Sequence, residues 1–182
     1  MKNQILLHCC CAVCASFCIE KLRNMDYEVI LFYSNSNIDT EDEFKKRLKE
    51  LEKLANIYRL ELVVDEYCHE DWLAAVQGLE NEPERGRRCG RCFAFNFNRA
   101  SEEAERRRIP FTTTLSISPH KDSKQLMTEG TMFENFEFFN FKKQNGYLET
   151  LALAKAYNLY RQNYCGCEFS KQHLLDILVE IA

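Results

Sequence analysis

The chain of 182 residues is long enough for one well-packed domain and short for two. Its 46% hydrophobic and 29% charged residues are typical of a globular protein, which excludes a disordered or fibrous chain. The formal net charge of −4 gives no overall positive field, so any contact with nucleic acid must come from local patches.

The start of the chain and its ten cysteines together predict a cytoplasmic protein. The opening MKNQILLHCC has too short an apolar run for a secretory signal. Elsewhere the sequence lacks the ~18 consecutive apolar residues of a membrane span, so we expect no membrane contact. Disulfides are rare in the cytosol, where clustered cysteines are usually metal ligands or redox centres.

Predicted strands and helices alternate along the chain. Strands are expected at residues 4–7, 29–33, 60–64, 111–117 and 136–141. Helices are expected at residues 12–25, 41–58, 70–79, 92–108, 147–157 and 170–181, the second capped by Asp39 or Thr40. This order predicts a single α/β domain over residues 1–182, with a mostly parallel, Rossmann-like sheet between helices.

Two unusual segments follow predicted strands directly. HCCCAVC, residues 8–14, follows the first strand, and SPHKDSK, residues 118–124, follows the fourth. Parallel α/β sheets bind ligands at the carboxyl ends of their strands, where both segments would lie. Ser118 and Pro119 have the pattern of a helix start, which would put Lys121 in a first turn, where a bound phosphate would offset its charge.

Two Cys-x-x-Cys pairs, Cys11 with Cys14 and Cys89 with Cys92, have the spacing of metal ligands. A structural zinc is one interpretation, but zinc ribbons separate their pairs by about 15–20 residues, and here 74 intervene. An iron–sulfur cluster accepts ligands from distant segments, and the adjacent Cys10 and Cys11 can reach different irons. Cations that favour thiolates surround the second pair: Arg85, Arg87, Arg88 and Arg91. The pattern therefore favours iron–sulfur chemistry.

A third pair, Cys165 and Cys167, encloses a single glycine. A disulfide here would close a very small, strained ring, and strained disulfides are labile and oxidising. Ser170 is the predicted N-cap of the last helix, whose positive end would favour thiolates. The pair is either a two-electron redox couple or a further metal site. The isolated Cys18 and Cys68 are interpreted as packing or surface thiols.

Basic residues near these clusters indicate an anionic substrate. The candidate substrate-binding residues are Arg88, Arg91, Lys121 and Arg161, whereas Arg106, Arg107 and Arg108 are interpreted as a solvated helix face. Candidate proton donors are His8, His120 and Asp65. For the two histidines, a purely structural role is the alternative.

Four segments, HCCCAVC, LENEPERGRRCGRCF, FTTTLSISPHK and LYRQNYCGCEFS, together resemble the QueH-type epoxyqueuosine reductases from Leu6 to Ser170. The resemblance implies a fold similar to adenine nucleotide alpha-hydrolase domains. It also implies site residues: Cys10, Cys11, Cys89 and Cys92 match the cluster-binding cysteines, and Cys165 and Cys167 match the redox-active pair. Cys14 matches a further motif cysteine of unassigned role, while Cys9 and Val13 depart from the family pattern.

By this resemblance, the chain would complete queuosine synthesis by removing the epoxide oxygen of epoxyqueuosine at the tRNA wobble position. It would use a [4Fe-4S] cluster, with room for a second iron ion, and an electron donor that is not identified. Epoxide removal takes two electrons and a cluster usually moves one, so the CGC dithiol or the extra iron would resolve the mismatch. An iron with an open position would also polarise the epoxide oxygen.

Three other functions are compatible with parts of the sequence. A nucleotide-activating tRNA-modifying enzyme would carry a glycine-rich phosphate loop where this chain has HCCCAVC. A zinc-stabilised RNA-binding module without redox activity would use the basic residues and exposed phenylalanines. A general dithiol reductase would use the CGC pair without RNA. A metal assay separates the zinc module, which would be colourless, from an iron–sulfur enzyme.

Overall fold

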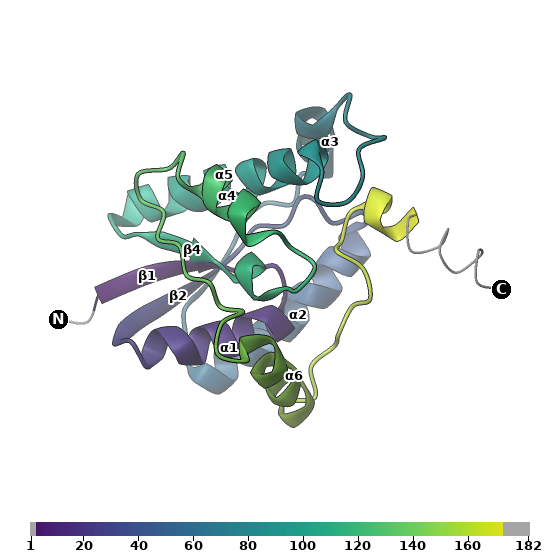
Figure 1. Cartoon of the computed structure of the whole chain (residues 1–182). Coiled ribbons are helices and arrows are strands. Elements are labelled where there is room, and N and C mark those ends of the chain that lie inside the picture. Colours follow the sequence, from purple (N-terminus) through teal and green to yellow (C-terminus); the bar gives the residue numbers. More distant parts are fainter. Residues whose placement is uncertain (1–2, 173–182) are drawn as a thin grey trace.

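A computed structural model describes residues 3–172 of the chain. Four strands form a parallel sheet in the order β3-β2-β1-β4, with β1 near its middle (Figure 1). The strands are β1 (Asn3–His8), β2 (Tyr27–Tyr33), β3 (Leu62–Val64) and β4 (Phe111–Thr113). Because all four run the same way, their carboxyl ends meet at one edge of the sheet.

Helices cover both faces of the sheet, which gives three layers (Figure 1). One face carries α1 (Ala12–Arg23), α2 (Glu41–Tyr58) and α6 (Gly146–Ala156). The other carries α3 (His69–Val76), α4 (Arg87–Arg107) and α5 (Ser123–Gly130). Side chains of β1 alternate between the two cores: Ile5 and Leu7 pack with α1 and α2, and Leu6 packs with α4. The predicted single-layer parallel sheet between helices is confirmed.

Helix predictions were most accurate where an apolar stripe and a cap coincide. The helix expected at residues 41–58 is α2, and Thr40 is its N-cap, with Oγ1 accepting from the Glu43 amide at 3.3 Å. The helices expected at 12–25, 70–79 and 147–157 differ from α1, α3 and α6 by at most three residues at either end. Across residues 3–172, no helix is long and apolar enough to cross a membrane.

Two elements near the site begin or end at other residues than the sequence predicts. α4 begins at Arg87 rather than residue 92, because Gly86 ends the preceding turn and the Arg87 amide donates to Glu82 at 3.1 Å. Both Cys89 and Cys92 are therefore helical. The strand expected at 111–117 ends at Thr113 and continues as a 3₁₀ helix, η1 (Thr114–Ile117). The Thr113 hydroxyl oxygen caps this turn by accepting from the Leu115 amide at 3.2 Å.

Two further predictions were wrong. The segment 136–141 forms no strand: a single parallel bridge joins Phe136 to Phe111, and its aromatic rings pack against neighbouring rings instead. The helix expected to start at Ser118 and Pro119 starts at Ser123, where Asp122 is the N-cap and accepts from the Lys124 amide at 2.8 Å. Lys121 therefore lies in the loop before α5 and not in a helical first turn.

The helix expected at 170–181 lies mostly outside the described residues. Helical structure begins at residue 168, so Ser170 is inside the helix and is not its N-cap. The Ser170 hydroxyl oxygen accepts from the Cys165 amide at 3.2 Å, and the hydroxyl donates to Glu84 at 2.7 Å. Its role is thus to fasten the CGC segment to the loop before α4.

The carboxylate of Asp65 ties the ends of β2 and β3 to α4. It accepts two hydrogen bonds from Arg99, each of 2.7 Å, and one from the Ser34 hydroxyl, also of 2.7 Å. Burial by itself raises the pKa of Asp65, but the bonds from Arg99 and Ser34 outweigh it and hold that pKa below its ordinary value. The geometry makes Asp65 a structural anion rather than a proton donor.

We expect Asp65→Asn to lower the free energy of unfolding by about 1–3 kcal/mol at pH 7, toward the lower end because Arg99 is partly exposed. The folded-state pKa is depressed, so the contribution of Asp65 is present above about pH 4 and is lost as the pH falls through that lower pKa. Urea unfolding at pH 7 and in acid measures this, with the exposed Glu134→Gln as control. Equal stability of D65N and wild type at pH 7 would contradict it.

Candidate metal and thiol site

The first cysteine group forms where the chain leaves β1. Cys11 is the N-cap of α1, and its Sγ accepts from the Cys14 amide at 3.4 Å. Cys10 is fastened to the end of β4: its amide donates to Thr114 Oγ1 at 3.0 Å, and the Thr114 hydroxyl lies 3.3 Å from Cys10 Sγ. The strand ends of β1 and β4 therefore meet, as the predicted position of HCCCAVC and SPHKDSK required.

The sulfur atoms of Cys10, Cys11 and Cys14 lie within 4.8 Å of one another. Three thiolates bound at about 2.3 Å to one tetrahedral metal ion would lie about 3.8 Å apart, so this group has the donor chemistry and nearly the spacing of a metal site. Hydrogen bonds from the Cys10 and Cys14 thiols lower the pKa of Cys11 well below its ordinary value. Cys11 is thus the member of the group that most readily becomes a thiolate.

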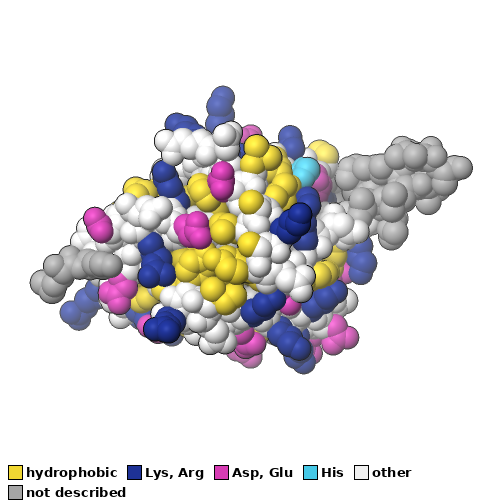
Figure 2. Space-filling model, turned by 90° about the horizontal axis from the view of Figure 1, so that it is seen from below, with side chains coloured by type: hydrophobic (Ala, Val, Ile, Leu, Met, Phe, Trp, Pro, Cys, Tyr) yellow, Lys and Arg dark blue, Asp and Glu magenta, His cyan; other side chains and the backbone are white. Residues whose placement is uncertain are grey.

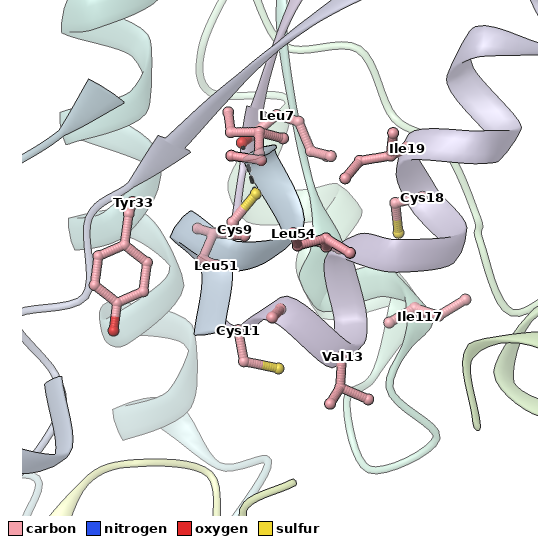
Figure 3. Packing of buried hydrophobic residues seen from close by; sticks show 14 of the residues in the cluster. Leu7, Cys9, Cys11, Val13, Cys18, Ile19, Tyr33, Leu51, Leu54 and Ile117 are labelled. Carbon is pink, nitrogen blue, oxygen red and sulfur yellow. Dashed lines mark hydrogen bonds between the residues drawn. The ribbon is translucent and has the colours of Figure 1, made fainter. Parts of the chain in front are cut away.

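Two neighbouring cysteines belong to the core instead (Figure 3). Cys9 and Cys18 are fully buried among aliphatic side chains, and the Cys9 thiol donates to the Leu7 carbonyl at 3.1 Å. Burial raises the pKa of both thiols well above the ordinary value. Cys9 is therefore a core residue outside the metal group.

A second thiol group combines α4 with the CGC segment. Cys89 Sγ accepts from the Arg85 amide at 3.3 Å, and Cys92 Sγ lies 3.7 Å from Asn96 Nδ2. Burial, and then the charges of Cys165 and Cys167, raise the pKa of Cys92. The helical pair and the CGC pair are therefore electrostatic neighbours.

The CGC segment is held in a fixed turn. Arg47 Nη1 donates to the Cys165 carbonyl at 3.0 Å, and the Gly166 carbonyl accepts from the Asp39 amide at 2.9 Å. Gly166 has a φ of +144°, and a Cβ there would lie 3.3 Å from atoms of Arg47, Asn37 and Ile38. Only glycine suits this conformation and this close approach, so the two cysteines are fixed on either side of a tight turn.

Lys121 lies at the centre of the second group. Its Nζ is 2.7 Å from Cys165 Sγ and 5.7 Å from the centre of the Phe93 ring. Its carbonyl accepts a hydrogen bond from Lys142. A shallow pocket beside it, too small to hold a water molecule, is lined by residues that include Cys89, His120 and Lys121. The loop before α5, the start of α4 and the CGC segment thus converge at the strand-end edge.

The predicted set of Cys10, Cys11, Cys89 and Cys92 does not form one compact group. Within the described part of the chain, the cysteines that lie close enough to share an ion are Cys10, Cys11 and Cys14. Arg47 connects the two thiol groups: its guanidinium donates to the Cys165 carbonyl at 3.0 Å. Burial lowers the pKa of Arg47, but the hydrogen bond to Glu43 and the charge of Cys11 outweigh burial and raise that pKa.

The candidate proton donors occupy different environments. His8 is fully buried, with Nδ1 3.0 Å from Thr113 Oγ1 and Nε2 3.0 Å from the Ser34 carbonyl. Burial lowers the pKa of His8 to about 4, so it is neutral at pH 7 and matches the structural alternative. His120 is exposed at the shallow pocket and remains the candidate donor that a substrate can reach.

The candidate substrate-binding arginines differ in their exposure to solvent. Arg88 is 4% exposed, and its guanidinium donates to the carbonyls of Leu79, Glu80 and Glu82, so it holds the loop before α4. Arg91 and Arg161 are exposed, the latter with Nη2 3.3 Å from the Tyr147 hydroxyl. Arg106 and Arg107 pair with Glu103, as expected of a solvated helix face.

Sequence reasoning missed Arg47, which holds the CGC segment through the Cys165 carbonyl. Arg47 is 2% exposed, although its side chain carries a charge. A signal was available, since Arg47 occupies the apolar stripe of α2, three residues after Phe44 and four before Leu51. A cation at a buried position of such a stripe requires a nearby anion or hydrogen-bond acceptor, because an unpaired buried charge is costly.

Comparisons with known proteins agree with this architecture. The sequence matches the family described as epoxyqueuosine reductase QueH over residues 5–173. A relative of that name from Thermotoga maritima is 35% identical over 177 residues, which cover 92% of this chain and 90% of the relative. Relatives from Haemophilus influenzae and Streptococcus pyogenes serotype M1 are 31% and 29% identical. These matches cover 92% and 93% of this chain, respectively, and 71% of each relative. The chain therefore belongs to the epoxyqueuosine reductase QueH family and is an oxidoreductase.

Proposed function

We propose that this chain removes the epoxide oxygen of epoxyqueuosine in tRNA, using a thiolate-bound iron–sulfur cluster and the CGC pair. The observation that carries the proposal is the convergence of two thiol groups at one sheet edge, one suited to metal and one in contact with the partly buried ammonium of Lys121. In the reaction the oxygen leaves as water and a carbon–carbon double bond forms, which consumes two electrons and two protons.

The cysteines present fit a thiolate-bound metal centre. Cys10 and Cys11 would hold the cluster together with Cys89 and Cys92, and Cys14 supplies a further thiol within 4.8 Å of the first two. When bound, the cluster supplies one-electron transfer, and a second iron ion would add Lewis-acid polarisation. The buried walls around Cys11 exclude water from its thiolate.

The CGC pair has the right electron count for the reaction. Oxidation of the Cys165 and Cys167 thiols to a disulfide releases two electrons and two protons, as many as the epoxide consumes. The tight turn at Gly166 and the hydrogen bond from Arg47 to the Cys165 carbonyl hold the backbone of the two cysteines in a fixed conformation. An electron donor then returns the pair to its dithiol state.

The strand-end edge also supports the approach of an anionic substrate. Arg91, next to Cys92 in α4, and Arg161, four residues before Cys165, are exposed, and so is His120, which would deliver a proton. On the face beneath α1 and α6, by contrast, lysine and arginine side chains are scattered around an apolar band (Figure 2). We therefore expect tRNA to meet the molecule at the strand-end edge.

The first prediction concerns metal content. Protein purified without oxygen should contain about four iron and four sulfide per chain and absorb near 400 nm, as thiolate-bound clusters do. Cys10→Ser and Cys11→Ser should each reduce iron to less than about half, because each removes a ligand from the compact group. Cys18→Ser, which changes a core thiol outside the group, is the matched control. One zinc per colourless chain would overturn the mechanism and favour the zinc-stabilised module.

The second prediction separates the redox pair from the cluster. Cys165→Ser should keep the iron and sulfide of the wild type but lose repeated turnover of epoxyqueuosine-containing tRNA by at least about 100-fold, since the two-electron couple is broken. Mass spectrometry of the nucleosides after digestion measures the product, and Cys68→Ser serves as the control. Full repeated turnover by C165S would exclude a redox role for the CGC pair.

A further inference from the structure

We propose that Lys121 and Cys165 form an ion pair that makes Cys165 the nucleophilic thiolate of the CGC pair and leaves Cys167 as the resolving thiol. This assignment rests on the proposed redox role of the pair and adds which of the two thiols reacts first. From the sequence alone, Lys121 is a candidate for binding a phosphate group of the substrate. The structure gives its ammonium group a partner within the protein.

The contact itself is short and specific. Lys121 Nζ lies 2.7 Å from Cys165 Sγ, closer than an ordinary hydrogen bond to sulfur. The ion pairs that join side chains of residues 3–172 do not include Lys121, so no carboxylate neutralises it there. Lys121 is partly buried, so its ammonium group has lost part of its hydration, and the thiolate form of Cys165 supplies a compensating anion.

The surroundings strengthen the pairing. Burial by itself lowers the pKa of Lys121, but the charge and hydrogen bond of Cys165, with Cys89 and Cys92 behind it, raise that pKa above its ordinary value. The other charged groups that face Cys165 act at longer range: Arg47 of α2 reaches its carbonyl, and Glu84 reaches Ser170. Lys121 is the cation that touches the sulfur.

The two thiols of the pair are unequal. Burial, and then the charge of Cys165, raise the pKa of Cys167 to about 12, so Cys167 is protonated at neutral pH. Cys165 is in contact with an ammonium, and a thiolate is the reactive form of cysteine. When the Cys165 thiolate attacks an aromatic disulfide probe, it forms a mixed disulfide and expels one thiolate. Cys167 then loses its proton, bonds to Cys165 and expels the second thiolate.

The test measures alkylation of Cys165 by iodoacetamide in the anaerobically purified protein, from pH 6 to 9, by mass spectrometry of the peptide that contains residues 162–171. We expect Cys165 of the wild type to react at least about tenfold faster than Cys167 at pH 7. Lys121→Met should slow the reaction of Cys165 at least about tenfold at pH 7, because the thiolate loses the cation beside it. Lys121→Arg should restore the rate, and Lys124→Met, in the same region but exposed, should leave it unchanged.

Two results would overturn the ion pair. One is an unchanged rate of Cys165 alkylation in K121M, and the other is a loss in K121R as large as that in K121M, since a charge effect tolerates arginine. If K121M fails to fold by circular dichroism, the wild-type rates decide, and a Cys165 that reacts no faster than Cys167 at pH 7 rejects the pairing. Alkylation needs no substrate, so a reactive Cys165 in a chain without reductase activity would reject the proposed function and keep the ion pair.

Discussion

The imidazole of His8 holds three strand ends together, and the site is built on that connection. Its ring lies between Thr113, at the end of β4, and the carbonyl of Ser34, just beyond β2. Because burial keeps the ring neutral, Nε2 carries the proton given to Ser34 and Nδ1 accepts from the Thr113 hydroxyl. The residues that follow each strand, including Cys10 and Thr114, are thereby brought to one edge.

The overall fold follows from local patterns because it depends on strand and helix periods. α2 was predicted to the residue, since the stripe that contains Phe44 and Leu51 begins at a capping threonine. The start of α4 was missed because its first turn is rich in arginine and glycine, and Arg88 is buried there against carbonyls of the preceding loop. Likewise, the phenylalanines of 136–141 fit a strand by composition, but they fill gaps between rings of the core.

The sequence identified the cysteines of the site, but it predicted only in part which of them lie together in space. Spacing marked Cys11 with Cys14 as a pair, and the alternation of strands and helices placed them at a strand end. That Cys10 joins them, while Cys9 one position earlier points into the core, depends on the turn that the chain makes between the end of β1 at His8 and the start of α1. The contact between Lys121 and Cys165 spans 44 residues of sequence and depends on tertiary packing alone.

The fastening of the CGC segment bears on the order in which the molecule folds. Arg47 and Lys121 contact Cys165 across 118 and 44 residues of sequence. Contacts of such high sequence separation cost loop-closure entropy, which local helices and turns do not. We therefore expect the CGC turn to become fixed late in folding, after α2 and the loop before α5 have packed on the sheet.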